Sequence, residues 1–398
     1  MKIGLLGQFG SGNTGNDGSL EAMLNFLRSA KSDAEILCIC SNPDAISKRF
    51  GVAATSIGGT SAQGRWFSHL NDLLADIPRR LFTLYSVFLQ LRGLDVLMIP
   101  GTGILDDFQE NAFGWPFVVF RWCLAARLRG MRIAFVSIGA GPIEGKLSRW
   151  FLKKAAQMAR YRSYRDDFSL RYVEKIGIDV RNDKRYPDIA FSLPLPQSLP
   201  QKTGPRPTVG VGVMDYHGWS KTEANADAIH ERYTDKLAAY VVWLLEKNLD
   251  VRLLTGDLRD DNAVGKVLAK IAAIAKDAPM ERVAASRSRN LQELMQDIAQ
   301  TDFVVVSRYH NVVCALKLGR PIISLSYNQK NDYLLAQFGQ EAYCQHIETF
   351  DLERLKQLTD DIVGNADAVR AEIHACNKSV REKLGEQQKL LLGDFLAG

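Results

Sequence analysis

Short apolar runs alternate with longer amphipathic stretches along the whole chain. The runs cover residues 2–7, 35–40, 95–99, 132–138, 208–214, 251–255, 303–306 and 322–326. They are rich in β-branched residues and apolar at successive positions, which is typical of strands buried on both faces of a parallel sheet. The amphipathic stretches between them predict helices. This alternation predicts an α/β fold with doubly wound, mostly parallel sheets.

A proline-rich segment divides this pattern into two halves. Its prolines are Pro194, Pro196, Pro200, Pro205 and Pro207. A chain of 398 residues is long enough for two domains, and a proline-rich stretch is a common boundary. We therefore predict an N-terminal domain at 1–197 and a C-terminal domain at 207–350. Residues 351–398 are charged and helical in pattern, and we expect them to cross back to the N-terminal domain.

Glycine-rich turns follow three strands of the first half, at 10–18, 101–107 and 139–142. In an open α/β sheet, ligands bind at the carboxyl ends of the strands. We expect the first turn to lead into a helix from Ser19 to about Ala30. Its glycines match the dinucleotide pattern G-x-G-x-x-G, but the second strand ends without the acid that such a site needs. A nicotinamide or flavin site is therefore disfavoured, and a turn without a ligand stays an alternative.

The stretch after 303–306 carries the clearest candidate chemistry. Ser307 is a predicted N-cap, and Arg308 and His310 follow in the first turn of a helix that continues through 312–318. A helix N-terminus attracts anions, and an arginine adds a planar fork for carboxylate or phosphate. His310 is a candidate proton donor. The alternative is that Arg308 pairs with a nearby carboxylate and that His310 is a satisfied core residue.

Composition narrows the classes of partner. The net charge of +5 fits small anionic ligands or an anionic membrane surface, but it is too low to predict nucleic-acid binding. The cysteines form no CxxC pair, which indicates reduced thiols. No secretory leader and no membrane-spanning run is apparent, so we expect a cytoplasmic protein. Segment 78–92 is basic at its ends and suits either a membrane surface or a core-facing helix, and we favour the core.

Four stretches, spread in order over most of the chain, resemble signatures of the polysaccharide pyruvyl transferase family. They are Gly12-Asn13-x-Gly15-Asn16-Asp17, Gly101-Thr102-Gly103-Ile104-Leu105-x-Asp107, Ser163-Tyr164-Arg165-Asp166, and Ser307-Arg308-Tyr309-His310 with Gly319-Arg320-Pro321 and Ser326-Tyr327. The chain departs from the family at two points. Thr102 replaces the middle of three glycines, and the family commonly shows Ser-x-Arg-Leu-His where this chain has Ser-Arg-Tyr-His.

The resemblance implies a fold of two facing Rossmann-like domains, similar to the two-domain (B-type) glycosyltransferase architecture. It also implies transfer of a pyruvyl group from phosphoenolpyruvate to sugar hydroxyls of a cell-surface polysaccharide or its precursor, which is lipid-linked in one reading. The product is a pyruvate ketal, and phosphate is released. Neither a metal nor a cofactor is expected, since phosphoenolpyruvate is the donor substrate. Peripheral contact with the inner membrane is a further expectation.

The substrate's carboxylate and phosphate require arginines and helix N-termini. We assign catalysis to Arg308, His310, Asp106 and Asp107, with His310 as the general acid and the aspartates orienting the acceptor or taking its proton. Substrate binding is assigned to Arg165, Ser307, Asn13, Asp17, Gly101, Gly103, His217 and Lys330. Trp219 is a candidate stacking surface for a sugar, although a buried ring is an equal alternative.

Two rival functions remain at this point. A glycosyltransferase using a nucleotide-diphosphate sugar would need the same fold and helix N-termini, whereas a non-catalytic scaffold would keep the fold alone. The Arg-x-His turn argues against both. Arg308 and the helix N-terminus disfavour a protonated His310, so we expect this side chain to take its proton mainly when phosphoenolpyruvate is bound.

Overall fold

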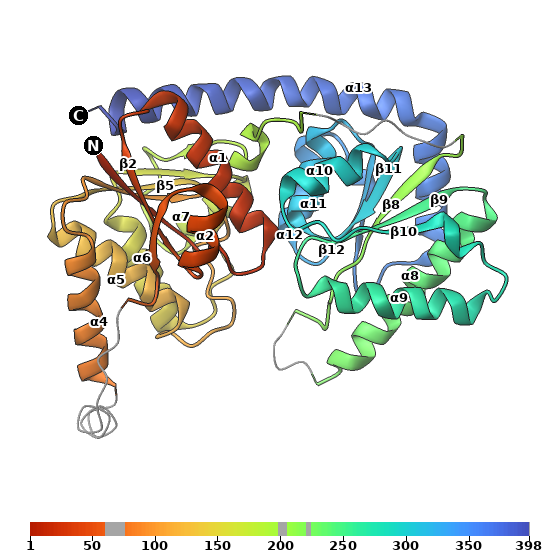
Figure 1. The fold of residues 1–398 in the computed structure, drawn as a ribbon, viewed down its shortest axis with the longest axis horizontal. Coiled ribbons are helices and arrows are strands. Elements are labelled where there is room, and N and C mark those ends of the chain that lie inside the picture. The colour runs from red at the N-terminus through yellow and green to blue at the C-terminus, as the bar shows by residue number, and fades with distance from the viewer. Residues whose placement is uncertain (60–75, 198–204, 220–223, 398) are drawn as a thin grey trace. The chain divides into compact units, whose positions relative to one another are not determined.

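The computed structural model describes residues 1–59, 76–197, 205–219 and 224–397. The chain forms two compact units, shown with their elements in Figure 1. Unit 1 comprises Met1–Ser11, Ser19–Ile189 and Lys383–Gly398. Unit 2 comprises Gly12–Gly18 and Ala190–Glu382. The short glycine-rich segment that we had placed in the N-terminal domain therefore packs with the second unit.

Unit 1 is built on a parallel sheet with the strand order β3-β2-β1-β4-β5-β6-β7. Each described pairing of neighbouring strands is parallel. The central strands β1, β4 and β5 are buried on both faces, so apolar side chains fill the spaces between this part of the sheet and its helices. The strands are β1 (Lys2–Leu6), β2 (Glu35–Cys40), β3 (Ala53–Ser56), β4 (Val96–Pro100), β5 (Arg132–Ile138), β6 (Tyr161–Tyr164) and β7 (Lys184–Arg185).

Helices alternate with these strands along the chain. The buried face of α5 packs with apolar residues of β4 and β5 in one cluster, which includes Trp122 and Phe135. The helices are α1 (Thr14–Ala30), α2 (Pro43–Phe50), α4 (Ile77–Gln90), α5 (Trp115–Leu128), α6 (Lys146–Gln157) and α7 (Asp167–Lys175), followed by the 3₁₀ turn Ile189–Ser192. The first residues of α1, up to Gly18, belong to unit 2.

Unit 2 repeats the plan with the strand order β10-β9-β8-β11-β12-β13, again with parallel pairings. Its strands are β8 (Thr208–Gly212), β9 (Asp250–Leu254), β10 (Val283–Ala285), β11 (Phe303–Val306), β12 (Ile322–Ser326) and β13 (Cys344–His346). Its helices are α8 (Ala226–Glu246), α9 (Asp260–Ile274), α10 (Leu291–Ala299), α11 (Tyr309–Lys317), α12 (Gln329–Gln337) and the greater part of α13 (Leu352–Leu390), with 3₁₀ turns at Met280–Arg282 and Glu341–Tyr343. The π-helical turn that follows α13, Leu391–Phe395, belongs to unit 1.

The strand order determines where each unit can bind a ligand. In unit 2 the first strand, β8, lies between β9 and β11, so the chain winds away from β8 in both directions. The same holds for β1, between β2 and β4, in unit 1. A crevice forms at the carboxyl ends of the strands beside such a switch point. The turn that carries Arg308 directly follows β11 and therefore lies at the switch point of unit 2.

Helix α13 is 39 residues long, and its last turns belong to unit 1. There the Gln387 side-chain amide donates hydrogen bonds to the hydroxyl oxygens of Ser137 and Ser163, each over 2.9 Å. All three side chains are buried, so these bonds connect the C-terminal segment to the centre of the unit 1 sheet.

Three helix starts differ from the sequence prediction. Helix α1 begins at Thr14 rather than Ser19, because the Asn13 side chain caps it by accepting from the N–H groups of Gly15 and Asn16 over 3.0 and 3.3 Å. Helix α8 begins at Ala226, well before Asp235, where the sequence pattern indicates a helix that runs to about Lys247. At α11 the N-cap is Arg308 and not Ser307, because β11 leads into an extended Arg308 with φ −67° and ψ 133°.

Among the described residues, no helix is long and apolar enough to span a bilayer.

Candidate active site

Arg308 lies at the start of α11, and its guanidinium forms a two-point ion pair with Asp260. Nε donates to Asp260 Oδ2 over 3.1 Å, and Nη2 donates to Oδ1. The Asp260 carboxylate is completely buried, and the Arg308 side chain keeps 14% of its surface exposed. The carboxylate partner that the sequence left open is therefore present. The two-point ion pair fixes the orientation of the Arg308 guanidinium at the edge of the sheet.

Asp260 is itself held by backbone groups from two strand ends. It accepts from the N–H groups of Gly256 and Asp257, over 3.1 and 3.0 Å, and from that of Asp215 over 3.0 Å. Those residues follow β9 and β8, the two strands nearest to β11 on that side. A carboxylate with three N–H donors and a guanidinium has no freedom to turn. Asp260 thereby fixes Arg308 relative to the switch point of the sheet.

The charge of Arg308 survives burial. Burial alone would lower the pKa of its guanidinium, but the attraction and hydrogen bonds of Asp260 outweigh this and raise the pKa above its ordinary value. Arg308 is therefore a permanent cation at the N-terminus of α11, where the helix dipole also favours negative charge. This combination favours binding of a carboxylate or phosphate.

The glycine-rich segment reaches the same place. The backbone of Asn13 forms an antiparallel bridge with Asp257, and the Thr14 hydroxyl donates to the carbonyl oxygen of Gly256 over 2.7 Å. Gly15 then contacts His310: a Cβ at residue 15 would lie 1.9 Å from the imidazole Nδ1. No side chain fits there, so the backbone of α1 forms one wall against the His310 ring.

Asn13 and Asp17, both predicted to bind substrate, lie in this first turn of α1. The Asn13 side-chain oxygen is occupied by the cap interactions that start the helix. Asp17 is 9% exposed. Unit 2 thus brings Asn13, Asp17, Arg308 and His310 into one neighbourhood. The predicted glycine loop is, from Thr14 onward, the beginning of a helix.

Three residues near Arg308 were not assigned from the sequence. Gly256 has to be a glycine, since a Cβ there would lie 2.6 Å from Asn311 Oδ1 and 3.1 Å from Arg308 Cγ. Asp257 accepts from Arg259 Nε over 3.0 Å, and the Arg259 side chain is 74% exposed. Burial works to raise the pKa of Asp257, but Arg259 and Arg308 hold it below 3.8. Arg259 is thus a second, accessible cation in the neighbourhood of Arg308.

The other predicted residues of unit 2 lie around these strand ends. Ser307 is buried, and its carbonyl oxygen accepts from the Asn331 side chain over 2.6 Å. Lys330, predicted as a phosphate contact, is 7% exposed in the first turn of α12. Trp219 is 41% exposed and stacks with Tyr327 at 6.1 Å between ring centroids. Of the two readings of Trp219, an exposed ring that can meet a sugar is therefore the one that fits.

His217 lies in a cluster that also offers metal-ligand atoms. Among the described residues, Asp215, His217 and His230 bring one such atom each within 4.8 Å of one another. However, the two imidazole rings stack in parallel, 4.3 Å apart at an angle of 3°. Each lone pair lies in its own ring plane, and an ion needs nitrogens at about 2.0–2.1 Å, so two parallel rings do not aim at one ion. The geometry disfavours a metal centre here.

In unit 1 the turn after β4 holds Asp106 and Asp107. Asp107 Oδ2 accepts from the N–H groups of Glu144 and Gly145, over 2.8 and 3.1 Å, at the start of α6. Its Oδ1 accepts from Gln109 N over 3.2 Å. Asp106 Oδ1 accepts from Phe108 N over 2.9 Å. Both carboxylates are buried, and that of Asp107 holds two loops together. Asp107 thus has a structural role, and its assigned part in catalysis stays a prediction.

The glycines of this turn have different roles. Gly101 has φ +59°, and a Cβ there would lie 2.5 Å from the Ser19 hydroxyl oxygen. Thr102 adopts φ +65°, a left-handed conformation that strains a β-branched residue. Gly103 is half-buried. The turn thus keeps a glycine-type backbone at Thr102 in spite of the threonine.

Arg165 is buried beside the same turn. It pairs with Asp188, with Nη1 3.0 Å from Oδ2, and lies 3.6 Å from Asp166. A Cβ on Gly139 would lie 3.0 Å from its guanidinium. Gly139 also bonds with the turn after β4, because its N–H donates to the Thr102 carbonyl oxygen over 2.6 Å. Unit 1 therefore brings Arg165 together with the turn that holds Asp106.

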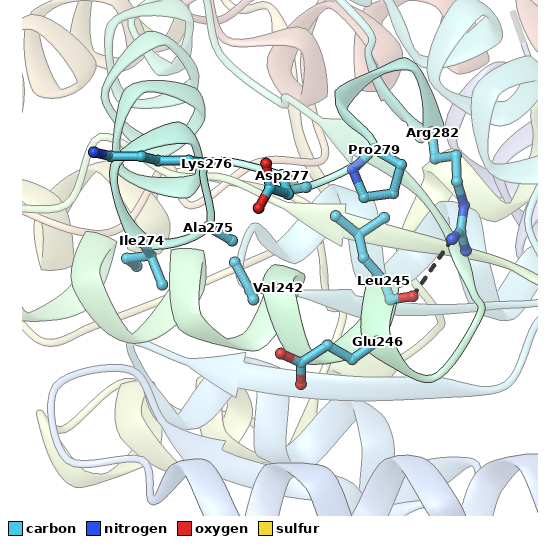
Figure 2. Close-up of a pocket in the computed structure, with 10 residues that line it drawn as sticks. Val242, Leu245, Glu246, Ile274, Ala275, Lys276, Asp277, Pro279 and Arg282 are labelled. Carbon is cyan, nitrogen blue, oxygen red and sulfur yellow. Dashed lines mark hydrogen bonds between the residues drawn. The ribbon is translucent and has the colours of Figure 1, made fainter.

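A separate pocket lies at the opposite edge of the unit 2 sheet, between the C-terminal ends of α8 and α9 (Figure 2). Its volume of about 520 Å³ is in the range of ligand pockets. The lining residues are Val242, Leu245, Glu246, Ile274, Ala275, Lys276, Asp277, Ala278, Pro279 and Arg282. Arg282 is engaged there with Asp250, at the amino end of β9. Because ligands of open α/β sheets bind at the carboxyl ends, we place the site at Arg308 instead.

Comparison with known proteins agrees with this arrangement. The family model of polysaccharide pyruvyl transferases matches residues 13–329, which include the turn at Gly15, the turn after β4, Arg165 and the Arg308–His310 turn. The chain belongs to the polysaccharide pyruvyl transferase family. This confirms the resemblance seen in the sequence. A comparison with curated protein sequences finds no significant match.

Solved structures show that the fold of this pyruvyl transferase family member is shared with other sugar enzymes. The UDP-GlcNAc 2-epimerase from Neisseria meningitidis, bound to UDP-GlcNAc, is similar at a TM-score of 0.61 and 9% identity, covering 97% of this chain and 100% of that one. The UDP-GlcNAc 2-epimerase from Methanocaldococcus jannaschii reaches 0.60 and 10%, covering 90% and 92%. An Anabaena protein in complex with UDP and glucose reaches 0.58 and 11%, covering 99% and 100%. These likenesses confirm the predicted two-domain fold with parallel sheets.

Proposed function

We propose that the protein transfers the pyruvyl group of phosphoenolpyruvate to sugar hydroxyls of a cell-surface polysaccharide or its precursor. The methylene carbon of phosphoenolpyruvate gains a proton, and a sugar hydroxyl attacks the central carbon and gives up its own proton. The bond from the central carbon to the phosphate oxygen then breaks, a second hydroxyl attacks the same carbon, and its proton goes to the departing phosphate. The products are a cyclic pyruvate ketal and inorganic phosphate, so atoms and charges balance.

The proposal rests on one observation: Gly15 contacts the His310 ring next to Arg308, whose guanidinium is held in place by Asp260. A braced guanidinium and the N–H groups of α11 suit the anionic groups of phosphoenolpyruvate. The imidazole is confined by the wall at Gly15, so it can hold a proton at a defined place. Membership of the pyruvyl transferase family supports the same reaction.

The proton of His310 depends on the substrate in this proposal. Arg308 and the N-terminus of α11 both disfavour the imidazolium, whereas bound phosphoenolpyruvate brings negative charges that offset them. His310 therefore takes up its proton on substrate binding and delivers it to the methylene carbon. In an NMR titration, the midpoint pH of the His310 ring signals should rise when phosphoenolpyruvate is added. A midpoint unchanged by the substrate would contradict this role.

For the acceptor sugar we propose the turn after β4 in unit 1. Asp107 is committed to backbone N–H groups, so Asp106 is the better candidate to orient or deprotonate a hydroxyl. Arg165, which we assigned as a second clamp, is held by Asp188 and contributes its charge at this turn.

Calorimetric titration tests the donor assignment. Phosphoenolpyruvate and a panel of nucleotide sugars are titrated into the wild type, Arg308→Lys and Arg282→Lys. Lysine keeps the charge beside Asp260 but loses the planar fork. Arg282 is a matched control, because its side chain is also 14% exposed and paired with an aspartate, at the opposite edge of the sheet.

We expect phosphoenolpyruvate to bind the wild type and Arg282→Lys alike, and Arg308→Lys about tenfold or more weakly, since one bidentate charged contact is lost. Equal affinity of all three proteins for phosphoenolpyruvate would show that its anionic groups do not bind at Arg308. The rival function is a glycosyltransferase, because similar structures contain UDP or UDP-GlcNAc. Binding of a nucleotide sugar without any response to phosphoenolpyruvate would favour that rival.

A further inference from the structure

Helix α4 of unit 1 presents an apolar stripe to the outside. Ile77, Leu81, Tyr85 and Leu89 recur at every fourth position, so they lie on one face of the helix. Their exposed fractions are 53%, 62%, 60% and 47%, and Phe82 beside them is 37% exposed. Scattered exposed leucines are ordinary, but a continuous row of this kind is not.

The opposite face of α4 makes the arrangement clearer. Its buried residues are Thr83, Ser86 and Val87, two of which are small and polar. A helix that packs on a core in water normally has the reverse pattern, with the large apolar residues inward. The sequence led us to favour a core-facing helix here. The structure confirms a core contact, because Val87 lies in the core cluster of unit 1 and Leu84 and Phe88 pack against it, but the row on the other face stays exposed.

A second group of exposed apolar residues lies on α6, which packs on α5, as α4 does. The Arg80 guanidinium lies over the ring of Phe113 at 3.6 Å, and Phe113 contacts Phe151 of α6 with 5.8 Å between ring centroids. Further along α6, Trp150 is 47% exposed and Leu147 43%. We call this surface the α4–α6 face. It consists of Ile77, Leu81, Phe82, Tyr85, Leu89, Phe113, Leu147 and Trp150. Figure 1 shows α4, α5 and α6 as neighbours within unit 1.

Charge identifies what such a face can meet. Helix α4 carries Arg79 and Arg80, and α6 carries four basic residues. Neither helix contains an acidic residue within its bounds. Asp76, just before α4, lies 3.2 Å from Arg79 and 4.0 Å from Arg80, so it offsets only part of this charge. The basic residues of α6 are Lys146, Arg149, Lys153 and Lys154.

We infer that the α4–α6 face binds the surface of an anionic lipid bilayer. Apolar and aromatic side chains flanked by basic residues are the pattern of helices that lie in the headgroup region. The tryptophan and tyrosine have both an apolar body and a polar tip, which suits that region. A second copy of the chain fits less well, because a two-fold interface would bring two basic surfaces together. This inference does not depend on the proposed function.

Co-sedimentation with vesicles tests the inference. The full-length protein is mixed with vesicles of neutral phosphatidylcholine, with or without anionic phosphatidylglycerol, at low and high NaCl. The test variant is Leu81→Ser/Tyr85→Ser. The control is Ile274→Ser/Val363→Ser, which removes two apolar side chains of similar exposure, 53% and 51%, from unit 2. All four residues are well exposed, and thermal unfolding checks that each variant folds.

We expect the wild type and the control to sediment with anionic vesicles and not with neutral ones. The test variant should bind about tenfold or more weakly, since two large apolar side chains no longer enter the headgroup region. Raising NaCl from about 0.1 M to about 1 M should release the protein, because the Debye length falls from about 10 Å to about 3 Å.

Two outcomes would overturn the inference. One is binding of the test variant equal to that of the control, which would place any lipid contact elsewhere. The other is a dimer that forms without lipid and is lost in the test variant, as sedimentation velocity would show; that result would make the face a contact between copies.

Discussion

Replacing Gly15 by alanine tests whether the position of His310 matters for chemistry. The added Cβ would lie 1.9 Å from the imidazole Nδ1, whereas ordinary contacts of a Cβ begin at 3.4 Å. The ring or the start of α1 must therefore move by about 1.5 Å, the difference between these two distances. Displacement of a reacting group by about 1 Å commonly costs about 10²-fold in rate. We expect a loss of this size in kcat/KM, equal to about 2.7 kcal/mol of transition-state stabilisation.

Gly18→Ala is the matched control for this experiment. It is the same substitution one turn later in α1, and its Cβ would meet Leu291 Cδ1 at 2.2 Å, not His310. Both alanines favour the helix by up to about 1 kcal/mol, so helix propensity does not separate them. The clash at residue 18 falls on the Leu291 side chain and not on His310 or Arg308.

Turnover is measured as phosphate released from phosphoenolpyruvate in the presence of acceptor, and unfolding by urea reports the stability of each variant. The account predicts a large loss for Gly15→Ala and nearly wild-type turnover for Gly18→Ala. Equal turnover of the two folded variants would refute the reasoning, because His310 would then tolerate displacement and would not be the general acid.

Three further predictions concern stability and use urea denaturation. Thr102→Gly should raise the free energy of unfolding by about 1 kcal/mol, since φ +65° no longer carries a β-branched side chain; no gain would contradict the strain. Asp107→Ala should lower it by roughly 2–3 kcal/mol because three N–H groups lose an acceptor, and an unchanged value would contradict the bridging role. Burial lowers the pKa of His230 below 6.5, so the unfolded state takes up protons first. Stability should fall as pH drops below 6.5, and His230→Gln should weaken this pH dependence; an identical slope would contradict it.

The strands were predictable because their signal is local. Residues 35–40, 132–138, 303–306 and 322–326 form strands at the positions where apolar runs indicated them. Each run is buried on both faces of a sheet, so its composition alone distinguishes it from its surroundings. The regular alternation of these runs with helices also predicted the doubly wound order in both units.

The predicted start of α1 was wrong, and the local sequence does not show the reason. Glycines at 15 and 18 have a low intrinsic helix propensity, and a run containing them indicates a loop. The structure starts the helix at Thr14 because Asn13 caps it and because Thr14 and Gly15 contact Gly256 and His310. Tertiary contacts of this kind override propensity, and they join residues more than two hundred positions apart.

The candidate site was predictable only in part. Arg308 and His310 were found from a strand, a turn and a helix that lie next to each other in sequence. Asp260, which fixes Arg308, is 48 positions away, and nothing in the pattern around it distinguishes it from a surface acid. Asp107 and Arg165 were found in the sequence, but their roles could not be assigned from it. A polar residue after a strand is equally compatible with catalysis and with holding loops together, and only its partners in the structure distinguish the two roles.

The most direct test of the central claim follows the central carbon of the donor. Phosphoenolpyruvate labelled with ¹³C at that carbon is incubated with the protein and with polysaccharide precursors, and NMR records the carbon and phosphorus signals. The account predicts a new quaternary ketal carbon attached to the sugar, inorganic phosphate in equal amount, and loss of both in His310→Gln. Unchanged phosphoenolpyruvate in a mixture where the same acceptor gains a sugar from a nucleotide donor would contradict the account.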